Sequence, residues 1–220
     1  IDIFIPCIDS EILKVSKSKE YLETTTGAHI FVDSYEKTSI CDDKLRTVEF
    51  LRANGFVYPE TWGHEDTLED ATYPLILKSR TGAGSRNVQE ISNKSALPTP
   101  ECPLNFILQE KLDGDEYTAG AYVGDDGQLK GLCILRRELK SGSTCYAERV
   151  LDVTMEQYLG SMATKLGMKY VNIQFRLKGG VPCPFEFNGR FSGTTGILQR
   201  IFNAPEMYIK ERVLGESVGA

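Results

Sequence analysis

Polar and apolar side chains alternate on both sides of the pair Gly179-Gly180. A period of two residues is typical of strands with one buried face, so the pattern predicts a hairpin. The polar face of this hairpin carries amides and charged groups: Asn172, Gln174, Glu186, Asn188 and Arg190. A carboxylate with amide oxygens suits Mg²⁺, and a neighbouring Arg suits phosphate. The alternative is a solvated sheet face that binds nothing.

The length of the hairpin connection decides whether these polar rows meet. A three-residue connection, 179–181, places Gln174 opposite Glu186 on one face and packs Phe175 with Phe185 on the other. A two-residue loop pairs Gln174 with Phe185 and separates the polar rows. Because glycine supplies the positive φ that a three-residue loop usually requires, we expect the longer connection.

A Lys followed by a glycine-rich segment is a second candidate. Lys78 ends a predicted strand, and the loop 81–86 contains Gly82, Gly84 and Ser85. Closely spaced glycines let backbone N–H groups approach a phosphate, and the Lys adds charge. The spacing matches neither the Walker loop nor the dinucleotide fingerprint. The alternative is a surface turn.

The acidic end of another predicted strand is the third candidate. The carboxylate of Glu110 and the backbone of Leu112 suit the edge of an adenine ring, and Glu116 suits ribose hydroxyls. The alternative is an ordinary acidic turn.

Predicted strands and helices along the chain would position these groups. Apolar runs bounded by turn residues predict strands at 1–5, 29–32, 75–78, 88–91, 106–110, 116–123, 129–139 and 144–150. Helical periodicity and capping residues predict helices from Asp9 or Ser10 through Leu22, and at 44–55, 154–166 and 205–214. This mixture predicts an α+β fold.

The order of the three candidates resembles that of the ATP-grasp superfamily. Lys78 with its loop, then Glu110 and Glu116, then the polar hairpin follow one another as in that family, over most of the chain. The resemblance is closest to carbamoyl-phosphate synthetase large-subunit-like proteins. It implies two α+β subdomains that clasp ATP, with the ATP-grasp domain at 35–220 and a lid subdomain at about 72–110. Residues 1–34 would be the C-terminal remnant of a preceding α/β domain, the pre-ATP-grasp domain.

The resemblance also implies a role for each residue. The cofactor-binding residues would be Lys44, Lys78, Gly82, Gly84, Ser85, Glu110, Leu112 and Glu116. The ligands of Mg²⁺, with Mn²⁺ as an alternative ion, would be Gln174, Glu186 and Asn188. Arg190 and Lys78 would act in catalysis, with Arg190 on the transferred phosphoryl group.

The implied function is that of an ATP- and Mg²⁺-dependent carboxylate-amine ligase. Such an enzyme activates a small-molecule carboxylate as an acyl phosphate, which an amine or similar nucleophile then attacks. The rivals are a non-catalytic or regulatory ATP-binding module and a phosphotransferase of the same fold. The synthetases carry a substrate-side His in the segment corresponding to 135–144, and this chain has none there, so we do not expect bicarbonate as substrate. Arg136 or Arg137 is the candidate for a substrate carboxylate, with a solvated basic pair as the alternative.

Composition limits the classes of partner. The chain has 220 residues, with 25 Lys and Arg against 31 Asp and Glu, and a formal net charge of −6. Nucleic acid is therefore not an expected partner, and no apolar run approaches the ~20 residues of a membrane span. The chain starts at Ile1 and reads as an internal piece of a longer protein, and its six scattered Cys predict reduced thiols in the cytoplasm. A homodimer is one option for its assembly.

Overall fold

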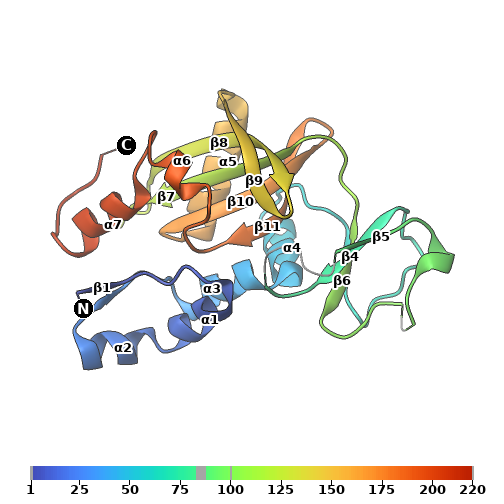
Figure 1. Ribbon diagram of the computed structural model, residues 1–220, viewed down its shortest axis with the longest axis horizontal. Helices are drawn as coiled ribbons and strands as arrows, with labels where there is room; N and C mark the ends of the chain where they lie inside the picture. The colour runs from blue at the N-terminus through green and yellow to red at the C-terminus, as the bar shows by residue number, and fades with distance from the viewer. Residues whose placement is uncertain (1, 83–87, 100, 220) are drawn as a thin grey trace.

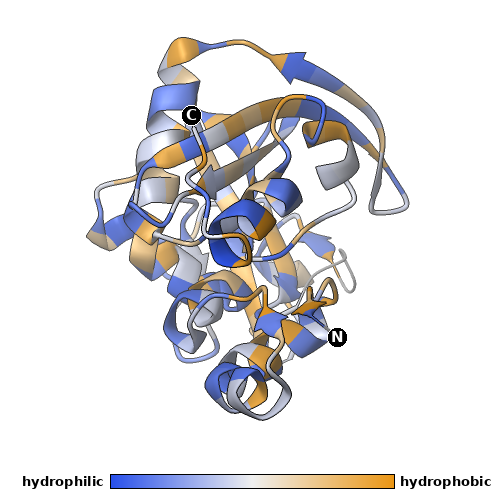
Figure 2. Ribbon diagram, turned by 90° about the vertical axis from the view of Figure 1, so that its left-hand side faces the viewer, coloured by the Kyte–Doolittle hydropathy of each residue, from blue (hydrophilic) through white to orange (hydrophobic). Residues whose placement is uncertain are grey.

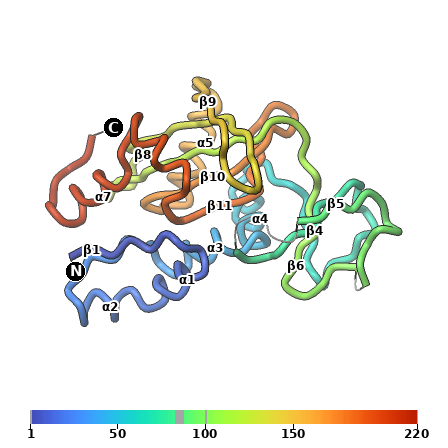
Figure 3. The backbone as a smooth tube through the Cα atoms, in the orientation of Figure 1, coloured from blue at the N-terminus to red at the C-terminus, as the bar shows by residue number. Residues whose placement is uncertain are grey.

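The computed structural model describes residues 2–82, 88–99 and 101–219. Figure 1 shows a larger lobe and a smaller lobe built on separate sheets, with the N-terminal segment below the larger lobe in this view. The backbone tube of Figure 3 follows the same path and sets the smaller lobe, which contains β4, β5 and β6, apart at the right.

The larger sheet has five strands in the order β11-β10-β7-β8-β9, and each neighbouring pair is antiparallel. Its strands are β7 (Glu116–Val123), β8 (Leu129–Lys140), β9 (Ser143–Val150), β10 (Tyr170–Lys178) and β11 (Val181–Asn188). Helix α5 (Val153–Leu166) contributes Leu159 and Met162 to a core that includes Val171 and Ile173 of β10. Figure 2 shows polar and apolar residues following one another along the strands. Because alternate residues of a strand point to opposite faces, this core fixes where the polar residues of β10 point.

The smaller sheet has four strands in the order β3-β6-β4-β5. They are β3 (Thr61–Trp62), β4 (Leu75–Ser79), β5 (Gln89–Ile91) and β6 (Phe106–Glu110), with a short 3₁₀ helix, η1 (Lys94–Ala96), between the last two. Leu75, Leu77 and Leu108 form a separate core on one face. The alternate residues Ile76 and Lys78 line a cleft on the other. The lid predicted at about 72–110 contains three of these strands, whereas β3 precedes it.

The N-terminal segment holds a parallel pair of short strands, β1 (Ile3–Phe4) and β2 (His29–Ile30). Between them the predicted single helix is divided at Ser18 into α1 (Asp9–Lys17) and α2 (Lys19–Thr26). The backbone N–H of Lys169 donates to Asp33 Oδ2 at 3.0 Å, and Tyr208 Oη donates to the carbonyl of Ile30 at 3.2 Å. These bonds attach the segment to the larger lobe.

Two helices join the segment to the cleft. Helix α3 (Tyr35–Asp42) was not predicted, because its sequence lacks a clear apolar stripe. Helix α4 (Lys44–Ala53) is capped by Asp43, which accepts from the Leu45 N–H at 3.0 Å. Asp43 Oδ2 also accepts from Arg80 Nη2 at 2.7 Å, which ties the chain after β4 to the start of α4. The remaining helices are α6 (Thr195–Leu198) and α7 (Ala204–Arg212).

The loop of the β10–β11 hairpin differs from the expected form. Lys178 pairs with Val181, so the connection consists of Gly179 and Gly180 alone. Both glycines have positive φ, at 59° and 82°, as in two-residue turns whose twist matches that of the strands. The predicted three-residue connection is wrong.

A bulge restores the pairing that the short loop would otherwise lose. The register shifts between Gln174 and Phe175, so that Phe175 pairs with Pro184 and Gln174 pairs with Glu186. Phe175 is fully buried, while Phe185 lines the cleft, so these two rings do not pack together as predicted. The predicted pairing of Gln174 with Glu186 is confirmed.

Close packing at Gly131 gives a stability prediction. A Cβ there would lie 2.5 Å from Cδ2 and 3.0 Å from Cβ of the buried Phe202. We expect Gly131→Ala to lower the free energy of unfolding by about 1–3 kcal/mol in urea denaturation, because the ring must shift. Gly196 has open space around its Cβ position, so Gly196→Ala is the control. Equal destabilisation by the two changes would contradict this packing.

Candidate active site

A cleft of about 750 Å³ lies between the two sheets. One wall comes from β4 and β6, and the other from β8, β10 and β11. Most of the predicted site residues line this cleft: Lys44, Lys78, Gly82, Glu110, Leu112, Glu116, Gln174, Glu186 and Arg190. Gly84 and Ser85 lie outside the described residues.

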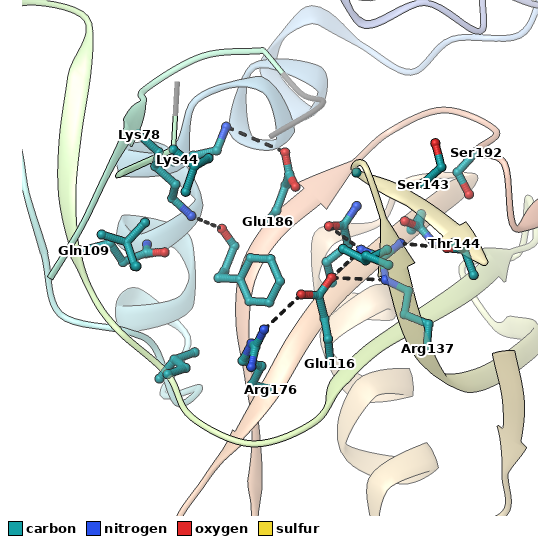
Figure 4. A pocket seen from close by; sticks show the side chains of 18 of the residues that line it. Lys44, Lys78, Gln109, Glu116, Arg137, Ser143, Thr144, Arg176, Glu186 and Ser192 are labelled. Carbon is teal, nitrogen blue, oxygen red and sulfur yellow. Dashed lines mark hydrogen bonds and ion pairs between the residues drawn. The ribbon is translucent and has the colours of Figure 1, made fainter. Parts of the chain in front are cut away.

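Two Lys side chains and one carboxylate face one another at one end of the cleft (Figure 4). Lys44 Nζ lies 3.7 Å from Glu186 Oε1 and donates to the carbonyl of Gly82 at 2.7 Å. Lys78 Nζ lies 3.5 Å from the carbonyl oxygen of Phe185 and 5.3 Å from the centre of its ring. Burial lowers the pKa of Lys78 from 10.5 to about 8, while the Glu186 charge acts in the opposite direction. Two Lys side chains that are close together and largely buried favour the binding of a polyanion.

Three oxygen-bearing side chains lie along the neighbouring hairpin. Gln174 and Glu186 pair across the two strands and both line the cleft. Asn188 is not among the residues that line the cleft, but it borders a smaller cavity together with Glu186 and Arg190. The three predicted metal ligands therefore lie on one sheet face, with Asn188 deeper than the other two.

The donor chemistry of these residues fits Mg²⁺. Within the described ranges, no group of three or more His, Cys, Asp or Glu side chains is arranged to hold a metal, so the amide oxygens would have to contribute. The buried Nδ2 of Asn188 has no hydrogen-bond partner in the same ranges, and Arg190 Nη2 reaches its Oδ1 at 3.4 Å. Gln174 Oε1 accepts from Arg137 at 2.8 Å, so this Arg must turn away if Gln174 is to bind an ion. A carboxylate and amide oxygens are hard donors of the kind that Mg²⁺ takes.

Glu116 is held between two Arg side chains. Arg137 Nη2 donates to its Oε1 at 2.7 Å, and Arg176 Nη2 donates to its Oε2 at 3.2 Å (Figure 4). The carboxylate lines the cleft, and its charge is already paired there.

Arg136 and Arg137, the two candidates for binding a substrate carboxylate, lie on opposite sides of β8. Arg137 lines the cleft and also contacts Thr144 Oγ1 at 3.5 Å. Arg136 pairs with Asp115 and Glu148 on the exposed surface, where strand alternation places it on the other side of β8. Arg136 therefore corresponds to the solvated alternative.

Glu110 and its neighbour Gln109 both reach the cleft from β6. Glu110 Oε2 accepts from Lys178 Nζ at 2.7 Å and from the Glu60 N–H at 3.0 Å. Gln109 is buried, and its Nε2 donates to Thr61 Oγ1 at 2.9 Å. Gln109 was not predicted as a site residue, although strand alternation places it on the same face as Ile76 and Lys78 across the β4–β6 pair.

Other lining residues carry no motif by which the sequence could have identified them. They come from the β8–β9 turn, from the start of β9 and from the chain after β11: Gly142, Ser143, Thr144, Ser192, Gly193 and Thr194. Figure 4 shows Ser143, Thr144 and Ser192 on the other side of the cleft from Lys44 and Lys78, close to Arg137.

Solved structures share this fold. An L-amino acid ligase from Bacillus licheniformis superposes with a TM-score of 0.67 and 19% identity over 88% of this chain and 50% of that one. A biotin carboxylase from Campylobacter jejuni, in a complex with β-γ-ATP, has a TM-score of 0.77 and 15% identity over 100% of this chain and 56% of that one. A D-alanine–D-alanine ligase from Bacillus anthracis has a TM-score of 0.65 and 19% identity over 90% of this chain and 71% of that one. The chain thus spans about half the length of the first two.

No curated protein matches the chain in sequence. No helix in the described part of the chain has the length and apolar character needed to cross a membrane. The predicted α+β ATP-grasp fold is confirmed. That the chain resembles carbamoyl-phosphate synthetase large-subunit-like proteins more than other members stays a prediction. Because the family model described as ATP-grasp domain matches residues 41–194, the chain belongs to the ATP-grasp family.

Proposed function

We propose that the cleft binds ATP with Mg²⁺ and activates the carboxylate of a small molecule for attack by an amine. The observation that carries this proposal is the meeting of Lys44 and Lys78 with Glu186 across the cleft. A site that binds adenosine alone has no need of two cations facing a carboxylate, whereas the transfer of a phosphoryl group does.

Each wall of the cleft would hold a different part of the nucleotide. Lys44, Lys78 and the backbone at Gly82 would bind the phosphates. Glu110, with the backbone of Leu112, would bind the adenine, and Gln109 is a further candidate for this role because it is buried beside them. Glu116 would bind the ribose once its bonds to Arg137 and Arg176 rearrange. The loop with Gly84 and Ser85 is a further proposed phosphate contact.

Glu186, Asn188 and Gln174 would hold Mg²⁺, with Mn²⁺ as the alternative ion. The metal would neutralise charge on the phosphates when bound. Arg190 and Lys78 would stabilise the charge that develops on the transferred phosphoryl group.

The proposed reaction has two steps. A carboxylate oxygen of the substrate attacks the γ-phosphorus, the bond from this phosphorus to the β–γ bridging oxygen breaks, and ADP leaves. The amine then attacks the acyl carbon, inorganic phosphate leaves with the bonding pair, and the amine loses a proton. Arg137, which lines the cleft beside Thr144, is the candidate for orienting the substrate carboxylate.

Trapping the acyl phosphate tests this function. The chain is incubated with ATP, Mg²⁺, hydroxylamine and panels of amino acids and other carboxylic acids, and ADP and hydroxamate are measured. Hydroxamate formed in amounts equal to ADP with one class of acid supports the ligase. ADP without hydroxamate for every acid supports the phosphotransferase alternative, and ATP binding without turnover supports a regulatory module. The expected homodimer and cytoplasmic location are separate proposals, which sedimentation and fractionation would test.

A further inference from the structure

A carboxylate from the N-terminal segment holds Arg190. Asp9, in the first turn of α1, accepts from Arg190 Nε at 2.6 Å and from Nη2 at 2.5 Å. The Arg190 side chain is 15% exposed and that of Asp9 33% exposed. Two parallel N–H···O bonds fix the plane of a guanidinium as well as its position.

The other edge of the guanidinium is less occupied. Arg190 Nη1 donates to the carbonyl of Phe191 at 3.3 Å, and Nη2 also reaches Asn188 Oδ1 at 3.4 Å. A guanidinium has five N–H groups, and within the described residues these bonds leave one Nη1–H without a partner. Because Arg190 lines both the main cleft and the small cavity beside it, this group is available to a ligand in the cleft.

Packing fixes Asp9 where it meets Arg190. Helix α1 packs against α3, and α3 packs against β11, the strand that leads to Arg190. Asp9, Asn188 and Arg190 border the same small cavity. The helix N-terminus also favours a negative charge at Asp9. The N-terminal segment thus reaches the site through the ion pair of Asp9 with Arg190.

We propose that Asp9 is a positioning residue, which holds Arg190 in the orientation that binds the nucleotide phosphates. The inference rests on the proposed function, because the phosphates are its ligand. A guanidinium oriented in advance loses less side-chain freedom when the ligand binds. Simple charge attraction makes the opposite prediction, since removing a carboxylate beside the cleft would strengthen the binding of a polyanion.

Binding measurements separate these two predictions. Isothermal titration calorimetry gives the dissociation constants of the full chain for adenosine and for a non-hydrolysable ATP analogue with Mg²⁺. We expect Asp9→Asn to weaken binding of the analogue by about 10-fold and to leave adenosine binding unchanged within about twofold. Asp9→Glu restores a carboxylate and should recover part of the affinity. Glu11→Gln removes the same charge from the same helical turn and is the matched control.

A double-mutant cycle tests whether Asp9 acts through Arg190. In an Arg190→Ala background, Asp9→Asn should produce no further loss. Unchanged or tighter binding of the analogue by Asp9→Asn, or an equal loss in both backgrounds, overturns the positioning role while leaving the proposed function intact. A wild-type chain that binds neither adenosine nor the analogue overturns the proposed function itself, and the positioning role with it.

Discussion

Replacement of Glu186 by Ala is expected to lower ATP turnover by about 1,000-fold or more, and to change adenosine affinity by less than about twofold. Glu186 is the charged member of the proposed ligand set for Mg²⁺, and its Oε1 faces Lys44 Nζ at 3.7 Å. Its removal leaves Gln109 and Leu112 in place at the other wall of the cleft. The loss should therefore fall on phosphoryl transfer rather than on nucleoside binding.

The measurement is ADP release at saturating ATP and Mg²⁺, with the acid that the trapping panel identifies. Glu148→Ala is the matched control, because Glu148 is an exposed strand residue that pairs with Arg136 away from the cleft. Turnover of Glu186→Ala within about threefold of the wild type would show that the metal assignment is wrong.

Replacement of Lys78 by Met should stabilise the nucleotide-free chain and weaken its binding of ATP. Burial lowers the pKa of Lys78 to about 8, so the charged side chain costs free energy in the folded state at neutral pH. We expect a gain of about 1–2 kcal/mol in the free energy of unfolding at pH 7, which is less than the full shift implies because the side chain borders the open cleft. Loss of the ammonium group should raise the dissociation constant of the ATP analogue by about 10- to 100-fold.

The pH dependence identifies Lys78 as the source of this gain. Below about pH 8 Lys78 is charged in both the folded and the unfolded chain, so the full free-energy cost of burying the charged side chain is present. Between about 8 and 10.5 the unfolded chain binds the extra proton, so the wild type gains stability relative to Lys78→Met as pH rises. Urea denaturation of both chains from pH 7 to 10 measures this difference. If the difference in the free energy of unfolding between the two chains stayed constant from pH 7 to 10, this would contradict the lowered pKa of Lys78.

Much of the architecture could be predicted from local sequence signals. The strand from Glu116 to Val123 and the helix that ends before Gly167 have clear periods and end signals, and both formed as predicted. Helix α3 has no apolar stripe, and its position depends instead on packing against α1 and β11. Its local signal is the N-cap at Ser34, whose Oγ accepts from the Lys37 N–H at 3.4 Å, and a cap without an apolar stripe is too weak to predict a helix.

The polar hairpin was predicted for a reason that is partly wrong. The pairing of Gln174 with Glu186 was predicted from the polar rows, but the three-residue loop invoked to produce it does not exist. A bulge at Phe185 accounts for the pairing, and bulges leave little trace in a pattern of alternation. Gln109 was not predicted as a site residue, and the choice between Arg136 and Arg137 was left open, because both depend on which face of a strand meets the cleft.

A crystal structure of the chain with Mg²⁺ and a non-hydrolysable ATP analogue tests the central claim most directly. We predict that the triphosphate lies between Lys44, Lys78 and Glu186, with the metal ion in contact with Glu186 and Asn188, and with the adenine beside Leu112. A nucleotide bound outside this cleft, or one whose phosphates lie away from Glu186, would contradict the account.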